Sequence, residues 1–221
     1  PSWEMIMIPE LIAGIAIGAA CKPLSDPVSK KLLTVRKKDF LENRTAFLIQ
    51  LVVSAGLGGA IGCIHGFSFM SLFLIMLLYT GNIISTTDVQ HRLIPNDTIL
   101  AFFGIKLVFG ILALLKVGDL PAWNPLLSLA GLGVLGAIFF LPGLLGKKIG
   151  FGDVKLAMAI GFCAELMPAL LAVCLMGILV ILYGIVQRRY SLAAFLRVNF
   201  PMGPFLCTAQ ILALLIGRAY F

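Results

Sequence analysis

Residues 167–186 read MPALLAVCLMGILVILYGIV, an apolar run of 20 residues with no charged side chain. A helix of about 20 apolar residues is long enough to cross the hydrocarbon core of a bilayer. The rest of the chain is similar, since 60% of its 221 residues are hydrophobic, 12% are charged and the mean hydropathy is +1.05. Soluble domains carry about 25% charged residues, and disordered chains have low hydrophobicity. The composition therefore excludes both classes and predicts an integral membrane protein.

Other apolar runs have comparable lengths and complete the predicted architecture. They are Met5–Cys21, Ala46–Ile64, Phe67–Thr86, Thr98–Leu115, Leu126–Leu145, Val154–Ala164 and Met202–Arg218. The run Val154–Ala164 is short, because 11 helical residues extend only about 16 Å. We therefore expect an all-α polytopic helical bundle of about eight membrane segments, one of them short.

The basic residues predict the orientation of these segments. Lys and Arg number 17 against 10 Asp and Glu, and such an excess gathers in the cytoplasmic loops of membrane proteins. If segment 22–44 is a cytoplasmic loop and all eight runs cross, 14 basic residues fall on the cytoplasmic side and only Lys116 and Arg218 on the other. Both termini then lie outside. The basic segment 22–44 is interpreted as a topology anchor or, alternatively, as a contact for anionic lipid or a substrate's basic flank. We do not expect nucleic-acid binding.

Two of the ten acidic residues stand out by their position. Asp88 follows the third apolar run, and Asp153 opens the short one, so both are predicted at the cytoplasmic membrane surface. Ionisable groups in such surroundings are costly and are candidates for function. Amide hydrolysis needs a base that activates water and an acid that protonates the leaving amine. Two neighbouring carboxylates that share one proton can supply both, so we predict that Asp88 and Asp153 are catalytic and assign the proton to the pair.

The stretch Gly150–Lys155, GFGDVK, also has a simpler interpretation. Glycines on either side of Phe151 allow a tight turn and a close approach of another backbone. Asp153 would then lie at the start of a helix, where it could act as an ordinary N-cap. The second aspartate at the same membrane face favours catalysis over capping.

These motifs together resemble the type IV prepilin peptidase family, which are bacterial intramembrane aspartic proteases of the GxGD type. The resemblance rests on Asp88 followed by RLIPN at 92–96, on GFGDVKL at 150–156 and on NFPMGPF at 199–205. It covers about two thirds of the chain and implies that Asp88 and Asp153 are the catalytic pair. The residues expected to support them are Gly150, Gly152, Lys155, Arg92, Pro95 and Asn96.

The resemblance also implies a substrate and a location. Members of the family cut the short basic leader from prepilins or pseudopilins, after a Gly and before the apolar pilin helix. We expect this to happen at the cytoplasmic face of the bacterial inner membrane, with the whole chain, 1–221, forming one transmembrane peptidase domain. The expected partners are the substrate helix and the lipid bilayer. Neither the particular pilin nor the oligomeric state follows from the sequence.

The chain departs from many family members in segment 22–44. Bifunctional members carry two CxxC pairs there as a zinc module, whereas this chain has no CxxC. We therefore expect no metal and no cofactor for proteolysis. S-adenosylmethionine would be needed only if the chain retains the methyl transfer that many members perform on the new N-terminus.

Several individual residues leave alternatives open. Lys155 could tune the pair or act as a positive topology anchor, and Arg92, Pro95 and Asn96 are expected mainly to set the turn after Asp88. Lys106, deep in the fourth run, has no predicted function and could reach the interface or pair with an acid. The alternative functions are a GxGD protease for another signal peptide, such as a preflagellin, and a small proton-coupled transporter. The sequence shows none of the inverted repeats typical of transporters.

Overall fold

A computed structural model describes residues 2–144, 150–186 and 201–217. These residues form eight helices and no strand, which confirms the predicted helical membrane bundle. The helices are α1 (Ser2–Val35), α2 (Arg44–His65), α3 (Phe69–His91), α4 (Asn96–Leu114), α5 (Pro125–Leu144), α6 (Phe151–Ala164), α7 (Leu166–Val186) and α9 (Met202–Gly217). Five of them, α1, α2, α3, α4 and α7, are long and apolar enough to cross a membrane, while α5 and α9 contain shorter apolar stretches and α6 has only 14 residues.

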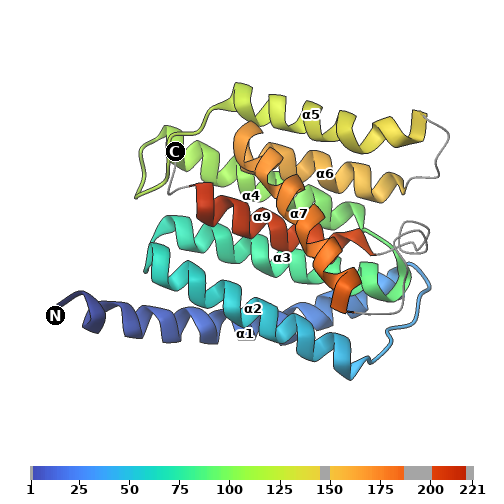
Figure 1. Cartoon of the computed structure of the whole chain (residues 1–221), viewed down its shortest axis with the longest axis horizontal. Helices are drawn as coiled ribbons and strands as arrows, with labels where there is room; N and C mark the ends of the chain where they lie inside the picture. Colours follow the sequence, from blue (N-terminus) through green and yellow to red (C-terminus); the bar gives the residue numbers. More distant parts are fainter. Residues whose placement is uncertain (1, 145–149, 187–200, 218–221) are drawn as a thin grey trace.

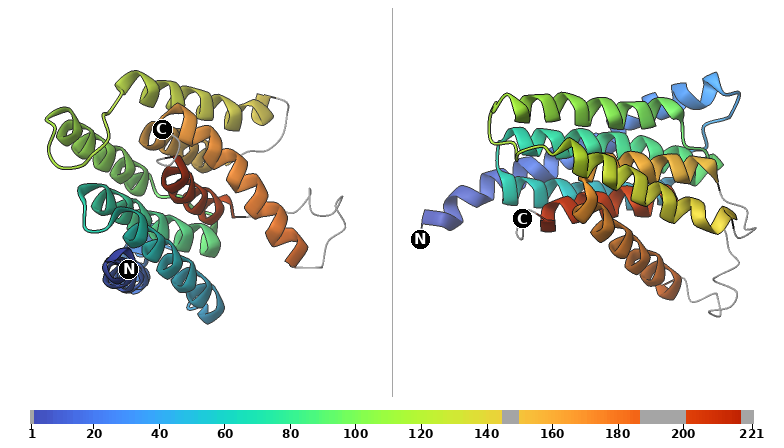
Figure 2. Two further views of the ribbon diagram at one scale, coloured as in Figure 1. Left: turned by 60° about the vertical axis from the view of Figure 1, so that its left-hand side comes forward. Right: turned by 90° about the horizontal axis from the view of Figure 1, so that it is seen from above.

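Successive helices run in opposite directions across the bundle, from side to side in the view of Figure 1. Helix α3 is buried along most of its length and packs against α1, α2, α4 and α9. The end of α3 and the starts of α4, α6 and α9 lie at one end of the molecule, where α1 also meets the segment that leads to α2 (Figures 1 and 2). This is the end that the charge pattern predicts to be cytoplasmic. Of the basic residues used in that argument, Lys147, Lys148, Arg188, Arg189, Arg197 and Arg218 lie outside the described residues.

Glycines allow two helix pairs to pack backbone against backbone. On α1 and α2, Gly14 and Gly18 face Gly58 and Gly62, and a Cβ on Gly58 would lie 2.6 Å from the Cα of Gly18. Small residues spaced four apart permit such close approach between membrane helices. Gly58, Gly59 and Gly62 thus serve packing, whereas Gly56 faces open space. Helices α5 and α6 meet in the same way through their own glycines.

The structure differs from the expected loop at 22–44, because α1 continues as a helix through Val35. Beyond the apolar run, Lys22, Ser25, Ser29 and Leu33 are all buried. Their spacing of three to four residues places them on one face of the helix. The hydroxyls of Ser25 and Ser29 donate to the carbonyls of Lys22 and Ser25, so they are satisfied inside the bundle. The prediction of a loop relied on the charged residues and missed this buried polar face of α1. Only residues 36–43 therefore connect α1 to α2.

Candidate active site

Asp88 lies in the last turn of α3 and is buried, with 4% of its surface exposed. The third apolar run was expected to end at Thr86, but the helix continues to His91, so Asp88 belongs to the helix and does not follow it. Its carboxylate Oδ2 accepts a hydrogen bond of 2.8 Å from the backbone N–H of Gly203. Gly203 is the second residue of α9, so Asp88 lies at the amino end of that helix, where the dipole favours a negative charge.

Gly203 has no side chain at a position where one would clash. A Cβ there would lie 2.9 Å from Oδ2 of Asp88 and 3.2 Å from its Cβ. The absence of a side chain allows the start of α9 to approach the carboxylate closely enough for the backbone hydrogen bond. Gly203 belongs to the segment NFPMGPF, in which no sequence feature indicated a contact with Asp88. The described part of this segment begins at Pro201.

The turn after Asp88 is formed by residues that the sequence singled out. Arg92 ends α3 in the left-handed conformation, with φ of 51°, and its backbone N–H donates to the carbonyl of Asp88. The exposed guanidinium of Arg92 is near enough to act electrostatically on the Asp88 carboxylate. Pro95 is buried and precedes the first residue of α4, Asn96. These residues place the end of α3 and the start of α4 together, as expected for a turn.

Asp153 lies in the first turn of α6, whose N-cap is Gly150. Asp153 is the third residue of the helix, two residues past its first, so the alternative of an ordinary N-cap does not describe it. The two glycines of GFGD lack side chains where a Cβ would lie close to a neighbouring residue. A Cβ on Gly150 would lie 2.8 Å from Asp153 Oδ2, and one on Gly152 would lie 3.3 Å from Cβ of Ile94. The flanking glycines therefore allow α6 to start close to the turn that follows Asp88.

The two aspartates are brought to the same end of the bundle. Asp153 is half-buried, and the charge of Asp88 acts on it electrostatically. Each carboxylate lies at the amino end of a helix, Asp88 at α9 and Asp153 at α6. Burial opposes the ionisation of both carboxylates, and so does their proximity, while the dipoles of the two helix ends favour the anionic forms. Such a pair can hold one proton between two acids.

Lys155 and Asn96, both predicted as supporting residues, contact each other. The ammonium of Lys155 donates to Oδ1 of Asn96 at 3.3 Å, and both side chains are exposed. This contact joins the first turns of α6 and α4. It connects the two motifs without touching either aspartate in the described structure.

A polar network joins α1 and α2 to the turns of α3 that precede Asp88. Lys22 pairs with Asp26 and donates to Thr86 Oγ1 at 3.1 Å, and Thr86 in turn donates to Gln50 at 3.2 Å. Ser54 donates to Asn82 at 2.9 Å. Asn82 and Thr86 therefore both make hydrogen bonds between helices. The role of Lys22 was missed, because its charge suggested a solvated loop.

The connection 36–43 is fastened to the end of α3. Gln90 uses both ends of its amide, which accepts from the backbone N–H of Leu41 at 3.2 Å and donates to the Leu41 carbonyl at 2.9 Å. A ring nitrogen of His91 lies 2.6 Å from the carbonyl oxygen of Asp39. These contacts hold the connection within three residues of Asp88, a proximity that sequence spacing could not reveal.

An apolar groove of about 470 Å³ opens beside the turn of α3 that carries Asp88. It is formed by α2, α3, α7 and α9, and its wall includes Ser85 and Val89 from the turn of α3 that carries Asp88, with Pro204 beside Gly203. An adjoining hollow of about 410 Å³ lies against the connection 36–43 and shares Asn43, Ala46, Gln50 and Val89 with the groove. The apolar groove and the more polar hollow therefore share part of their walls at the end of α3.

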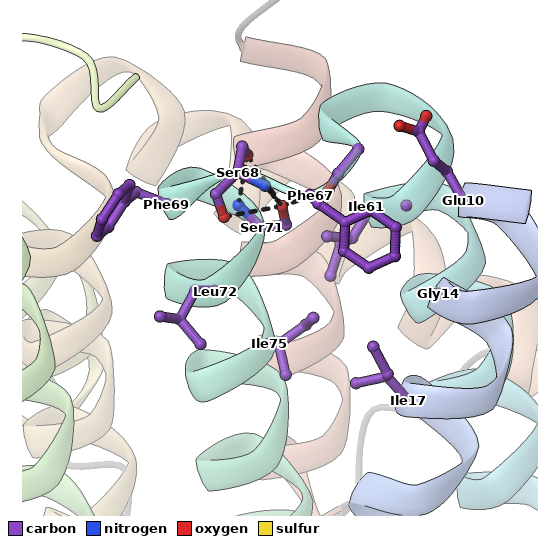
Figure 3. A pocket seen from close by; sticks show the side chains of 12 residues that line it. Glu10, Gly14, Ile17, Ile61, Phe67, Ser68, Phe69, Ser71, Leu72 and Ile75 are labelled. Atoms are coloured by element: carbon purple, nitrogen blue, oxygen red, sulfur yellow. Dashed lines mark hydrogen bonds between the residues drawn. The ribbon is translucent and has the colours of Figure 1, made fainter. Parts of the chain in front are cut away.

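A further pocket, between α1, α2 and α3, is too far from the aspartates to take part in their chemistry. Figure 3 shows Glu10 at its edge and the hydrogen-bonded Ser68 and Ser71 in its wall. Ser71 precedes Asp88 by 17 residues on one helix, which corresponds to about 25 Å. Among the described residues, no group of three or more His, Cys, Asp or Glu lies together as a metal site would require.

Comparisons with known proteins match residues 71–185 to the type IV leader peptidase family. The prepilin leader peptidase/N-methyltransferase of Stutzerimonas stutzeri is 25% identical over 218 residues, which cover 98% of this chain and 68% of that protein. The protein of the same name from Pseudomonas aeruginosa is also 25% identical, over 220 residues, 97% of this chain and 67% of its own length. No solved structure matches the chain.

Proposed function

The chain belongs to the type IV leader peptidase family, and from this premise we propose that it is an aspartic endopeptidase that cleaves prepilins or pseudopilins. The observation that carries the proposal is the pairing of Asp88 and Asp153. Helix α3 ends and helix α6 begins at the same end of the bundle, and each carries one of the two carboxylates there. The two helices come from different parts of the region matched to the family. The membrane setting follows from the apolar helices, and the bacterial relatives are prepilin leader peptidases by name.

In the proposed reaction the two carboxylates share one proton. The ionised carboxylate takes a proton from water, whose oxygen attacks the carbonyl carbon of the scissile peptide bond. In the tetrahedral intermediate the C–N bond then breaks, and the pair delivers a proton to the departing amine. One water is consumed, and a carboxylic acid and an amine are formed, with no covalent intermediate. Which aspartate holds the proton is a property of the pair.

The groove supports the proposed substrate. Its lining is mainly apolar, it reaches into the membrane-embedded part of the bundle, and it ends beside Asp88. The apolar helix of a pilin would lie in it, with its amino end toward the aspartates. The basic leader would lie at the cytoplasmic face, beyond the scissile bond. Helix α9 starts at Met202, and the prolines on either side of its start, Pro201 and Pro204, lie in the wall of the groove.

The supporting residues have proposed positional roles. Gly150 and Gly152 allow α6 to begin near the turn after Asp88, while Arg92 and Pro95 shape that turn. Lys155 and Asn96 connect the two motifs. The proposed arrangement is one peptidase domain over 1–221 in the inner membrane, with the active site facing the cytoplasm.

Methyl transfer is a separate activity and is not needed for this reaction. Both relatives carry it in their names, so it would require S-adenosylmethionine if this chain performs it. The hollow beside 36–43 does not provide a prepared site for that cofactor, because its half-buried carboxylate, Asp26, is already paired with Lys22. We therefore derive no step through it and propose that proteolysis needs no cofactor.

The test uses purified protein in detergent with a prepilin substrate. We expect Asp88→Asn and Asp153→Asn each to abolish cleavage, while Asp39→Asn, which changes an exposed acid of the connection 36–43, retains it. Mass spectrometry of the product would give the cleavage site and any added methyl group. Undiminished cleavage by either active-site variant would exclude the proposed pair.

A further inference from the structure

Lys106 is the cation within the fourth apolar run for which the sequence suggested no function. It lies in the middle of α4, is 9% exposed, and donates to Oε1 of Glu165 at 3.1 Å. A lone charge at this depth would be costly, so membrane proteins pair such groups. Glu165 is therefore its partner, and the question is what this buried ion pair contributes.

Glu165 occupies an unusual backbone conformation. It lies between the last residue of α6 and the first residue of α7, with φ of 67° and ψ of 173°. This region of conformational space is essentially restricted to glycine, and other residues remain there only where the surrounding structure holds them. Since Lys106 binds the Glu165 side chain, the ion pair is one of the contacts that hold this corner.

The corner fixes one end of α6, and the catalytic aspartate lies at the other. Two contacts join α4 to α6 with the same sequence separation of 59 residues, Asn96 to Lys155 and Lys106 to Glu165. Between them, Cys163 Sγ donates to the carbonyl of Phe102 at 3.3 Å. The two helices therefore run parallel in a fixed register. Because α6 contains no proline and extends only about 21 Å, an axial shift at Glu165 is passed on to Asp153.

Asp88 is positioned independently of this register. It is held by α3 and by the backbone of Gly203 in α9, and the substrate groove is formed by α2, α3, α7 and α9. Movement of α6 along α4 would thus change the distance between the two carboxylates, and α6 itself contributes no residue to the wall of the groove. Gly131 and Gly161 hold α6 sideways against α5, but smooth glycine surfaces oppose sliding less than a charged contact does.

We propose that Lys106 and Glu165 form a positioning pair that sets the axial position of α6, and with it the placement of Asp153 opposite Asp88. The proposal rests on the proposed function, since it assumes that Asp153 reacts. Neither residue touches the substrate or the reacting atoms. Their effect is on kcat, through the geometry of the pair.

The first measurement compares kcat and KM for prepilin cleavage by Lys106→Met and Glu165→Gln. We expect Lys106→Met to lower kcat about tenfold, because a misplacement of about 1 Å can cost about 10²-fold in rate. KM should change less than about twofold, since uniform substrate binding is retained. Glu165→Gln keeps a hydrogen-bond acceptor and should lose less. Lys30→Met, which removes an exposed lysine, is the matched control and should match the wild type.

The second measurement separates positioning from general stability. Exchanging the charges, Lys106→Glu with Glu165→Lys, should restore a large part of kcat. Glu165→Gly removes the ion pair but suits the left-handed backbone, so it should keep a thermal midpoint near that of the wild type while kcat falls. Loss of kcat without loss of stability is not expected from a merely structural contact.

Contradictory results would be distinguishable. Wild-type kcat in folded Lys106→Met or Glu165→Gln would overturn the positioning pair. The positioning pair would also be overturned if Glu165→Gly lost stability together with kcat and if the exchange of charges between the two positions failed to restore kcat. Asp153→Asn is measured in parallel: if it cleaves normally, the proposed function fails, whereas an inactive Asp153→Asn beside a fully active Lys106→Met rejects only the positioning pair.

Discussion

Gly203→Ala tests whether the start of α9 holds the Asp88 carboxylate in place. The added methyl carbon would lie 2.9 Å from Oδ2 of Asp88, 3.2 Å from Cβ of the same residue and 3.2 Å from Cγ2 of Ile84. Carbon atoms prefer separations of about 3.5–4.0 Å, so the neighbours must move by roughly half an ångström. All three atoms belong to the buried last turns of α3, which cannot yield without moving the carboxylate.

The expected loss follows from this displacement. The Gly203 N–H to Asp88 Oδ2 distance is 2.8 Å, and a shift of roughly half an ångström takes it beyond the usual range for a charge-assisted hydrogen bond. Such a bond to a charged group contributes about 1.5–3 kcal/mol, and overpacking typically costs about 1–3 kcal/mol. Since a misplacement of about 1 Å can cost about 10²-fold in rate, we expect kcat to fall between about 10-fold and 100-fold.

The assay is cleavage of a prepilin by the purified variant in detergent, followed by quantification of the mature product. Gly104→Ala in α4 is the matched control, since a Cβ there meets nothing within 4 Å. It should cleave at the wild-type rate. Wild-type kcat in a folded Gly203→Ala protein would refute the reasoning, because the added methyl could then be accommodated without displacing Asp88.

Other predictions address the packing around the site. Gly58→Ala should separate α1 from α2 and lower the free energy of unfolding by about 1–3 kcal/mol. Gly56→Ala, at a position that faces open space, should leave the free energy of unfolding unchanged. Denaturation in detergent measures both variants. Lys22→Met should destabilise by about 3–5 kcal/mol because Asp26 loses its partner, and equal unfolding midpoints for variant and wild type would contradict a buried pair. Gln90→Ala should remove two hydrogen bonds of about 1 kcal/mol each from the connection 36–43, so amide exchange at Leu41 should become faster; unchanged exchange would argue against this attachment.

Sequence reasoning predicted the elements of this fold more successfully than their ends. Apolar runs located all of the described helices, most of them because a bilayer demands about 20 apolar residues per crossing, and α6 by a shorter run. It failed where burial involved polar side chains. The helix α1 continues past Cys21 through Lys22 and Ser25 to Val35, and α3 continues past Thr86 through Asp88 to His91. In both cases neighbouring helices satisfy the polar groups, and hydropathy does not register such partners.

The candidate site divides in the same way. Asp88 and Asp153 were recognisable because acids are scarce and both follow characteristic motifs. Gly203 was not, since a glycine's function here is a backbone contact with a residue 115 positions away. Lys106 was recognised as unusual, but its partner Glu165 was not, because the pairing depends on the register between α4 and α6.

The sequence by itself determined the membrane setting, the number of apolar segments and the family, and it supplied the two candidate acids, because each is a property of composition or of local spacing. The tertiary structure decided which groups meet. It placed the backbone of α9 on Asp88, the connection 36–43 on the end of α3, and Lys106 on Glu165. The physical reason is that hydrogen bonds and ion pairs between helices depend on depth and rotation. Close packing at glycines sets both, and no single segment encodes them.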